Sequence, residues 1–171
     1  MAILDSGTRR EFESGAVRDC AEGRGRCDLL PLDVAAELLA YYSDFQGMTA
    51  SVDVLKFVSN FLVAGSYIDL YQALYAFCNR NSWGVPEMLL EVSKHFEEGA
   101  NKYGERNWEK GIPAHCYVDS AVRHYLKWCE DIIDERHDRA FCWNILCLVW
   151  TLKHHPECND LPGVSADGNG G

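Results

Sequence analysis

The sequence has no C-x-x-C pair, no secretory apolar segment near its start and no apolar run that could cross a membrane. The longest apolar run, residues 141–152, is well short of the ~20 residues that a spanning helix needs. The charged residues Arg9 and Arg10 follow the start too closely to leave room for a signal peptide. We therefore expect a cytoplasmic protein without membrane contact. Its eight cysteines should be free thiols rather than a disulfide framework or a cysteine zinc site.

Positive charge is also scarce, because 16 Lys and Arg residues oppose 26 Asp and Glu residues and leave a formal net charge of −10. This balance argues against duplex nucleic acid as a partner, since Lys and Arg supply the non-specific part of that affinity. The surplus of carboxylates suits either a solvated surface or a cluster that holds a divalent cation. A length of 171 residues with a 47% hydrophobic share predicts one globular domain.

Apolar periodicity predicts an all-α fold, with no internal repeat and no cleanly alternating strand outside the N-terminal arm. Residues 1–28 are rich in Gly, Arg and acids and are predicted to form an irregular arm. Residues 159–171 are expected to be a disordered tail, which limits the domain to residues 1–158. Helices are expected near residues 33–42, in two short segments within 52–77 that break at Gly65–Ser66, and near 87–103, 117–131 and 134–154.

A helical wheel of residues 87–103 separates two neighbouring acids. Glu97 falls at the edge of the apolar face, whereas Glu98 lies nearly opposite that face. Glu97 is therefore predicted to point into a cleft, and Glu98 to form a surface pair with Lys102 four residues later.

Five carboxylates occur within nine residues, at Glu130, Asp131, Asp134, Glu135 and Asp138. A divalent cation among the oxygens would relieve their repulsion, and Mg²⁺ commonly binds one or two carboxylates together with substrate phosphates. On a helix, Asp131 with Asp134 or Glu135 would supply one side of such a site, and Glu97 on the other helix would supply the second. The alternative is a solvated corner between helices.

The glycine-bounded segment 99–111 combines cations, amides and aromatic rings. Lys and Arg bind phosphates and an aromatic face can stack on a base, so this segment suits a nucleotide. A loop that packs Trp108 on the core would have the same composition. Asn144 lies in a helix that is apolar nearly all round, where a buried amide needs a partner. Asp119 and Arg123, four residues apart, allow either a surface ion pair or a place in the site.

Several motifs follow one another in a recognisable order: residues 15–19 and 23–31 of the arm, then 96–111, 119–124, 134–137 and Trp143–Asn144. This order resembles the dATP/dGTP diphosphohydrolase N-terminal family, the MazZ-like and MazG-like all-α nucleoside triphosphate pyrophosphohydrolases of phages and bacteria. The resemblance covers about residues 11–40 and 86–155. It implies a MazG-like helical bundle with an irregular arm and an inserted helical pair at residues 43–85.

The resemblance also implies hydrolysis of a purine deoxynucleoside triphosphate, such as dATP or dGTP, to a monophosphate and pyrophosphate with Mg²⁺ or Mn²⁺. The candidate metal ligands are Glu97, Asp131, Asp134 and Glu135. The candidate catalytic residues are Glu97, Asp119 and Glu135. The candidate substrate contacts are Lys102, Tyr103, Arg106, Asn107, Trp108, Lys110, Arg123, His124 and Asn144.

Two departures from the family pattern keep a second hypothesis open. Residues 43–85 have no counterpart in compact relatives, and Lys94 and Asn101 stand where a second acid would pair with Glu97. The alternative is a non-hydrolytic phage protein that sequesters a signalling nucleotide, and a purely structural helical module is a third reading. For the leading hypothesis the expected partners are a purine nucleotide and further copies of the chain in a dimer or tetramer. The expected location is the cytoplasm of a bacterial or phage-infected cell.

Overall fold

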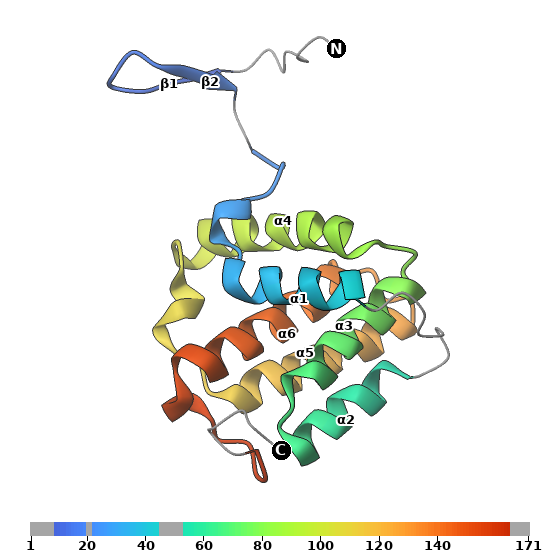
Figure 1. The fold of residues 1–171 in the computed structure, drawn as a ribbon. Coiled ribbons are helices and arrows are strands. Elements are labelled where there is room, and N and C mark those ends of the chain that lie inside the picture. Colours follow the sequence, from blue (N-terminus) through green and yellow to red (C-terminus); the bar gives the residue numbers. More distant parts are fainter. Residues whose placement is uncertain (1–8, 20–21, 45–52, 165–171) are drawn as a thin grey trace.

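The computed structural model describes residues 9–19, 22–44 and 53–164, which fold into a bundle of six α-helices (Figure 1). This confirms the all-α prediction. The helices are α1 (Leu32–Asp44), α2 (Val54–Ala64), α3 (Tyr67–Arg80), α4 (Val85–Tyr103), α5 (Ala114–Cys129) and α6 (His137–His154). Short 3-10 turns flank them at η1 (Cys27–Leu29), η2 (Asn107–Lys110) and η3 (Pro156–Cys158).

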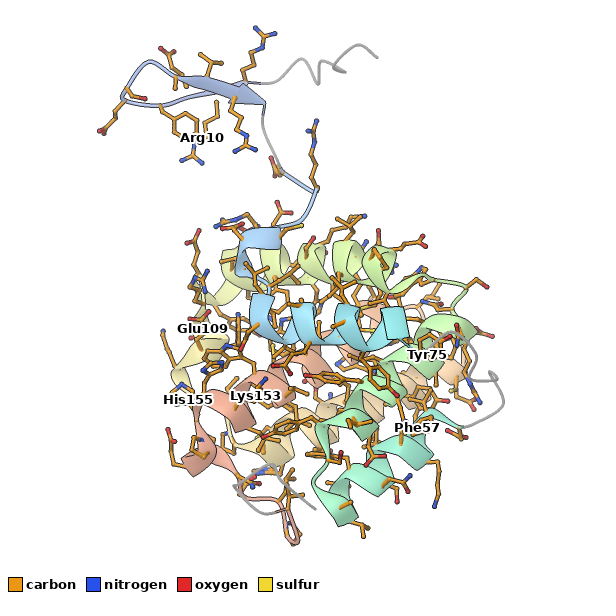
Figure 2. All side chains as sticks on the ribbon, in the orientation of Figure 1. Arg10, Phe57, Tyr75, Glu109, Lys153 and His155 are labelled. Atoms are coloured by element: carbon orange, nitrogen blue, oxygen red, sulfur yellow. The ribbon has the colours of Figure 1, made fainter. Side chains whose placement is uncertain are left out.

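The arm contains a short antiparallel hairpin of β1 (Arg9–Glu11) and β2 (Val17–Asp19), which lies apart from the bundle (Figure 1). Arg10 stands opposite Arg18 in the register, and the guanidinium of Arg10 lies 5.0 Å from the centre of the Phe12 ring. Figure 2 shows Arg10 on this hairpin, away from the helices. The arm is thus partly extended, and its second half returns to the bundle at η1.

The predicted break between α2 and α3 is confirmed and has a clear local cause. Asp53 caps α2 by accepting a hydrogen bond from the Leu55 amide at 2.9 Å. Gly65 ends the helix in the left-handed conformation, with φ of 71° and its amide bonded to the Phe61 carbonyl. In α4, Pro86 stands in the first turn, where a missing N–H costs nothing, and Gly104 follows the last residue.

The core is centred on α6, whose side chains are buried nearly all round the helix. Helix α5 packs along α6, α4 packs across it, and α3 contributes Phe77 to the same core. The Phe77 ring centre lies 4.6 Å from that of Phe141 and 4.9 Å from that of Trp128. Residues of the predicted helical insert therefore share one core with the rest of the bundle. None of the described helices has the length and apolarity of a membrane span.

The acidic stretch differs from the prediction in its local structure. Helix α5 ends at Cys129 and α6 begins at His137, so Asp131, Asp134 and Glu135 lie on the connecting turn rather than on a helix. Asp131 adopts the left-handed conformation, with φ of 52°. Its amide bonds to the Trp128 carbonyl, and the next amide bonds to that of Lys127, which is the pattern that closes many helices. Asp tolerates this conformation better than most residues, which explains why the helix stops there.

The predicted disordered tail begins at residue 159, and its first residues lie on the bundle. Leu161 is buried, and the Asp160 carboxylate accepts a hydrogen bond from the His115 amide at 2.9 Å. Residues 165–171 lie outside the described part of the chain. The seven described cysteines are free thiols, as expected, while Cys20 lies outside the described residues.

Candidate functional site

Glu97 holds the N-terminal arm on α4. Its carboxylate accepts hydrogen bonds from the backbone amides of Gly23 at 3.0 Å and Gly25 at 2.8 Å. The Arg26 amide adds a bond to the Ser93 carbonyl at 2.9 Å. Gly25 has φ of 91°, and a Cβ there would lie 2.1 Å from Ser93 Oγ, so only glycine fits. Glu97 consequently binds the arm and does not face the acidic turn, which corrects the arrangement expected from the wheel.

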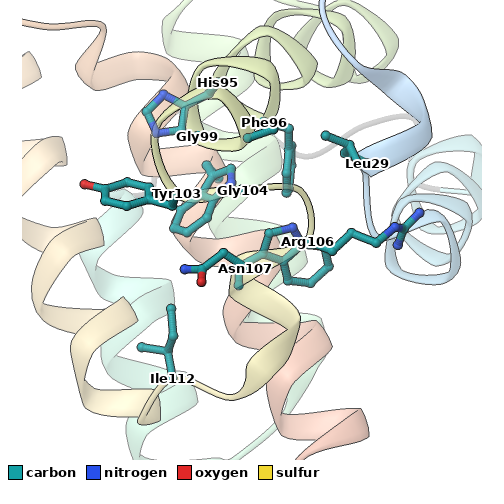
Figure 3. A pocket seen from close by; sticks show the side chains of 12 residues that line it. Leu29, His95, Phe96, Gly99, Tyr103, Gly104, Arg106, Asn107 and Ile112 are labelled. Atoms are coloured by element: carbon teal, nitrogen blue, oxygen red, sulfur yellow. The ribbon is translucent and has the colours of Figure 1, made fainter.

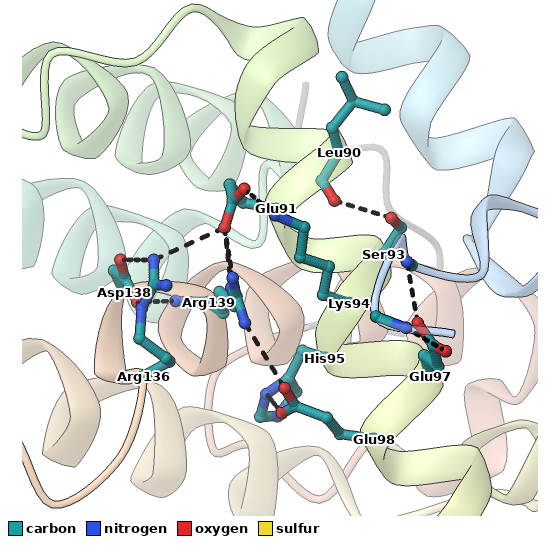
Figure 4. A network of polar contacts seen from close by, with 12 residues as sticks. Leu90, Glu91, Ser93, Lys94, His95, Glu97, Glu98, Arg136, Asp138 and Arg139 are labelled. Atoms are coloured by element: carbon teal, nitrogen blue, oxygen red, sulfur yellow. Dashed lines mark hydrogen bonds and ion pairs between the residues drawn. The ribbon is translucent and has the colours of Figure 1, made fainter. Parts of the chain in front are cut away.

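Glu98 lies on the opposite side of α4, toward α6 (Figure 4). Its carboxylate is 3.5 Å from Nη1 of Arg139 and 3.7 Å from Nδ1 of His95. The predicted surface pair with Lys102 is replaced by these contacts, and the Lys102 ammonium lies 4.9 Å from the centre of the Tyr103 ring. The wheel gave the angle between Glu97 and Glu98 but could not show that the arm covers one side and α6 the other.

Arg139 joins α4 to α6 from a nearly buried position (Figure 4). Its Nε and Nη2 donate to one oxygen of Glu91 at 2.9 and 2.6 Å, and Lys94 donates to the other oxygen at 2.5 Å. Burial alone would raise the pKa of Glu91, but the hydrogen bonds from Lys94 and Arg139 outweigh it and lower that pKa. These contacts make a charged joint between the two helices.

Two buried histidines meet beside the acidic turn. Nδ1 of His124 lies 2.9 Å from Nδ1 of His137, and one oxygen of Glu135 lies 3.3 and 3.4 Å from these two nitrogens. Asp134 contacts Nε2 of His137 at 2.5 Å and receives a hydrogen bond from Lys127 at 2.8 Å. Burial lowers the pKa of His124, against the opposing effect of Glu135. His124, a predicted substrate contact, is part of this cluster.

A pocket of about 280 Å³ opens between the end of α4, η2 and α6 (Figure 3). Its walls are mainly apolar and include several aromatic rings: the ring centre of Phe96 lies 5.5 Å from that of Trp108 and 5.9 Å from that of Trp143. Of the predicted substrate contacts, the lining includes Tyr103, Arg106, Asn107 and Trp108. Trp108 is buried in the core, so it forms a wall of the pocket and not a mobile loop side chain.

Other predicted contacts lie around this pocket or away from it. Lys110 donates to the Asn107 side chain at 3.2 Å, which places it beside the pocket. Asn144 is buried and donates to the Ala140 carbonyl at 2.8 Å, which supplies the partner it was expected to need. Asp119 and Arg123 form an ion pair at 2.8 Å on an exposed face of α5, and neither lines the pocket.

His95 connects the pocket to the charged residues. It lines the pocket, and its ring centre lies 5.7 Å from that of Trp143. Burial lowers its pKa, while the charges of Glu98 and Glu135 act in the opposite direction, so both carboxylates are close enough to affect it. Sequence reasoning gave no role to His95 or Arg139, and it assigned Glu98 only a surface pair with Lys102. The available signal was weak, because a single histidine on an amphipathic helix is usually part of the core.

The four predicted metal ligands do not converge on one point. The Glu97 oxygens bind the arm, and Asp131 stands in the helix-closing turn, so only Asp134 and Glu135 stay together. Two other carboxylates, those of Glu98 on α4 and Glu135 on the α5–α6 turn, both influence the pKa of His95. Their side chains are 60% and 50% exposed, and the oxygens of Glu98 lie near Arg139 and His95, while one oxygen of Glu135 lies near His124 and His137.

Comparison with known proteins identifies one family. The family model described as "dATP/dGTP diphosphohydrolase, N-terminal" matches residues 76–161. The match spans the end of α3 and continues through α6, so it includes the charged joint, both clustered histidines and every residue that lines the pocket except Leu29. The arm, α1 and α2 lie outside it. No curated protein and no solved structure matches the chain significantly. Since the match covers half of its residues, the chain belongs to the dATP/dGTP diphosphohydrolase N-terminal family.

Proposed function

We propose that the chain hydrolyses a purine deoxynucleoside triphosphate, dATP or dGTP, to the monophosphate and pyrophosphate, with Mg²⁺ or Mn²⁺. Membership of a family described by this activity supports the proposal. The observation that carries it is the position of His95, which lines the pocket, lies 3.7 Å from the carboxylate of Glu98 and is close enough to Glu135 for that charge to influence its pKa. A nucleotide needs both a pocket with aromatic rings and carboxylates that hold a cation, because its base is planar and its phosphates bind a cation.

The pocket would hold the base. Its volume of about 280 Å³ lies just below the range of about 300–1,000 Å³ for sites that enclose drug-sized ligands. It therefore suits a base alone, with the sugar and phosphates outside. Phe96, Trp108 and Trp143 offer aromatic surface, and the Asn107 amide offers polar atoms at the rim. From His95 the phosphates would extend toward the α5–α6 turn.

The phosphates would meet charge of both signs there. Lys102 is exposed and near enough to Glu135 for that charge to contribute to its raised pKa, after the larger effect of Tyr103. It would neutralise phosphate oxygens directly. Glu98 and Glu135 would hold the divalent cation, which when bound stabilises developing negative charge and acidifies a bound water.

Pyrophosphate release tests this assignment. Replacing Glu98 or Glu135 by Gln should reduce kcat for dATP and dGTP by about 100-fold or more, as for removal of a strong transition-state interaction. Glu87→Gln is the matched control, because Glu87 is an exposed acid on the same helix and should leave turnover unchanged. Full activity in Glu98→Gln with loss in Glu97→Gln would instead support the ligand set expected from the sequence.

Sequestration without hydrolysis is the second candidate. The charged joint favours it, because Arg139 bridges Glu91 and Glu98 and competes with a cation for their oxygens. Incubating the protein with Mg²⁺ and a panel of nucleotides separates the two functions. Recovery of intact nucleotide from a tight complex supports sequestration, whereas free pyrophosphate supports the enzyme.

A further inference from the structure

We propose that His124, His137 and Glu135 form a binding site for a tetrahedral transition-metal ion, with Zn²⁺ as the expected occupant. The three donor atoms are Nδ1 of each histidine and one carboxylate oxygen of Glu135. This inference does not require the proposed function, because it concerns the donor set and not the substrate, although Glu135 has a place in both. It differs from the predicted Mg²⁺ site in using nitrogen ligands from two buried helical residues.

The distances between the donor atoms match one face of a tetrahedron. With bonds of about 2.0–2.1 Å to nitrogen and oxygen, the ligand atoms of tetrahedral Zn²⁺ lie about 3.3–3.4 Å apart. In this cluster the oxygen of Glu135 lies 3.3 Å from His124 Nδ1 and 3.4 Å from His137 Nδ1. The two nitrogens lie 2.9 Å apart, so they need to separate by a few tenths of an ångström. Three protein ligands would leave the fourth position for water or a phosphate oxygen.

Asp134 favours the tautomer of His137 that a metal ligand needs. Its carboxylate contacts Nε2 of His137 at 2.5 Å, which favours a proton on Nε2 and leaves the lone pair of Nδ1 directed at the cluster. A carboxylate bound to the far nitrogen of a metal-binding histidine is a common feature of zinc sites. Lys127 holds Asp134 from the other side at 2.8 Å. The supporting residues that a metal site needs are therefore already in contact.

The donor set also selects the class of ion. Imidazole nitrogens suit Zn²⁺ and other transition metals, whereas Mg²⁺ prefers oxygen ligands in octahedral geometry. Both histidines are buried, so their rings are held by packing and lose little freedom when the ion binds. Glu135 contributes one oxygen, and its second oxygen remains for the divalent cation of the proposed function. The two kinds of ion can thus be separated experimentally.

Titration with Co²⁺ after removal of metals by chelation tests the site without measuring turnover. Co²⁺ replaces Zn²⁺ in such sites, and we expect one equivalent to produce the strong visible absorption of four-coordinate Co²⁺. One equivalent of Zn²⁺ should remove that absorption, and millimolar Mg²⁺ should not. An absent signal, or the weak spectrum of six-coordinate Co²⁺, would overturn the proposal.

Variants assign the ligands. Glu135→Gln changes a half-exposed residue and should preserve the fold while weakening Co²⁺ binding at least tenfold. His137→Asn should abolish binding, and circular dichroism checks that this buried substitution is tolerated. Asp134→Asn should weaken binding about 10–100-fold and keep the four-coordinate spectrum. His115→Asn is the control, because His115 is exposed and also contacts an aspartate, Asp160. Equal affinity in the wild-type protein and Glu135→Gln would refute the assignment.

Discussion

At the scale of single residues, neighbouring positions of α4 have opposite tasks. Glu97 accepts two backbone hydrogen bonds from the arm, and Glu98 approaches Arg139 and His95. Consecutive side chains on a helix point about 100° apart, which is enough to place Glu97 and Glu98 in different environments. The arm contact depends on the absence of a side chain at Gly25, where the backbone lies against Ser93.

Replacing Gly25 by Ala should release the arm. Both Gly23 and Gly25 have positive φ, so Ala at either position costs about 1–2 kcal/mol of backbone strain. Only at Gly25 would the new Cβ overlap Ser93, whereas Gly23 faces open space. Amide hydrogen exchange at Arg26 should therefore accelerate much more in Gly25→Ala than in Gly23→Ala. Equal exchange in the two variants would contradict the contact with Ser93.

At the scale of helices, α6 is the central element, against which most of the other helices pack. It is buried along its length, and charged side chains at its two ends attach it to α4 and α1. Near its start, Arg139 binds Glu91 of α4. Near its end, Lys153 forms an ion pair with Glu37 of α1, and Glu37 also accepts a hydrogen bond from Tyr71 of α3 at 2.7 Å.

Arg139→Met should be destabilising because it removes the guanidinium that contacts both Glu91 and Glu98. Loss of one member of a buried pair costs about 3–5 kcal/mol, and we expect the lower end because Lys94 and Arg136 still neutralise Glu91. Adding Glu91→Gln to Arg139→Met should recover much of this free energy, since the unpaired charge is then removed. Urea unfolding of the single and double variants measures both values. A double variant less stable than Arg139→Met would show that the charge of Glu91 is not the cause.

The contacts of Glu37 predict a pH dependence of stability. Burial would raise the pKa of Glu37, but its bonds to Lys153 and Tyr71 outweigh this effect and lower the pKa below the ordinary value of about 4.5. A lowered carboxyl pKa stabilises the folded state above pH 4.5, and that stabilisation is lost as the pH falls through the folded-state pKa. The free-energy difference between the wild-type protein and Glu37→Gln should therefore shrink on acidification. A difference that stays constant from pH 7 to about pH 3 would contradict this linkage.

The sequence predicted the positions of the helices well, but it predicted the contacts of their side chains less well. Helix spans follow from local periodicity and from stop signals such as Gly65, and these depend on near neighbours in the chain. The end of α5 was missed because Asp131 adopts a left-handed conformation that no apolar pattern reports. Several residues of segment 99–111, whose composition suits a nucleotide, line the pocket. The tasks of Glu97 and His95 depend on distant segments that pack against α4, which a helical wheel does not contain.

At the scale of the whole molecule, the family match and the core have different extents. The match covers residues 76–161, whereas the core also includes buried side chains of α1, α2 and α3. Buried residues before the match, such as Leu38, Phe61 and Leu70, belong to the same core cluster as the side chains of α6, so this segment is part of one packed unit. The bundle is therefore expected to unfold cooperatively. A single unfolding transition seen by both fluorescence and circular dichroism would support this.

The cysteine thiols can report on opening of the bundle, because some of them are buried and others are exposed. Cys78, Cys142 and Cys147 are buried, and burial raises the pKa of all three, that of Cys78 to about 12. Cys27, Cys116 and Cys129 are exposed. Brief alkylation followed by mass spectrometry should therefore modify these three first and the three buried cysteines together, at the rate at which the bundle opens. Modification of Cys147 as fast as Cys116 would rule this out. The factor by which a substrate or metal ion slows alkylation of the buried cysteines would then measure its effect on opening of the bundle, without any added label.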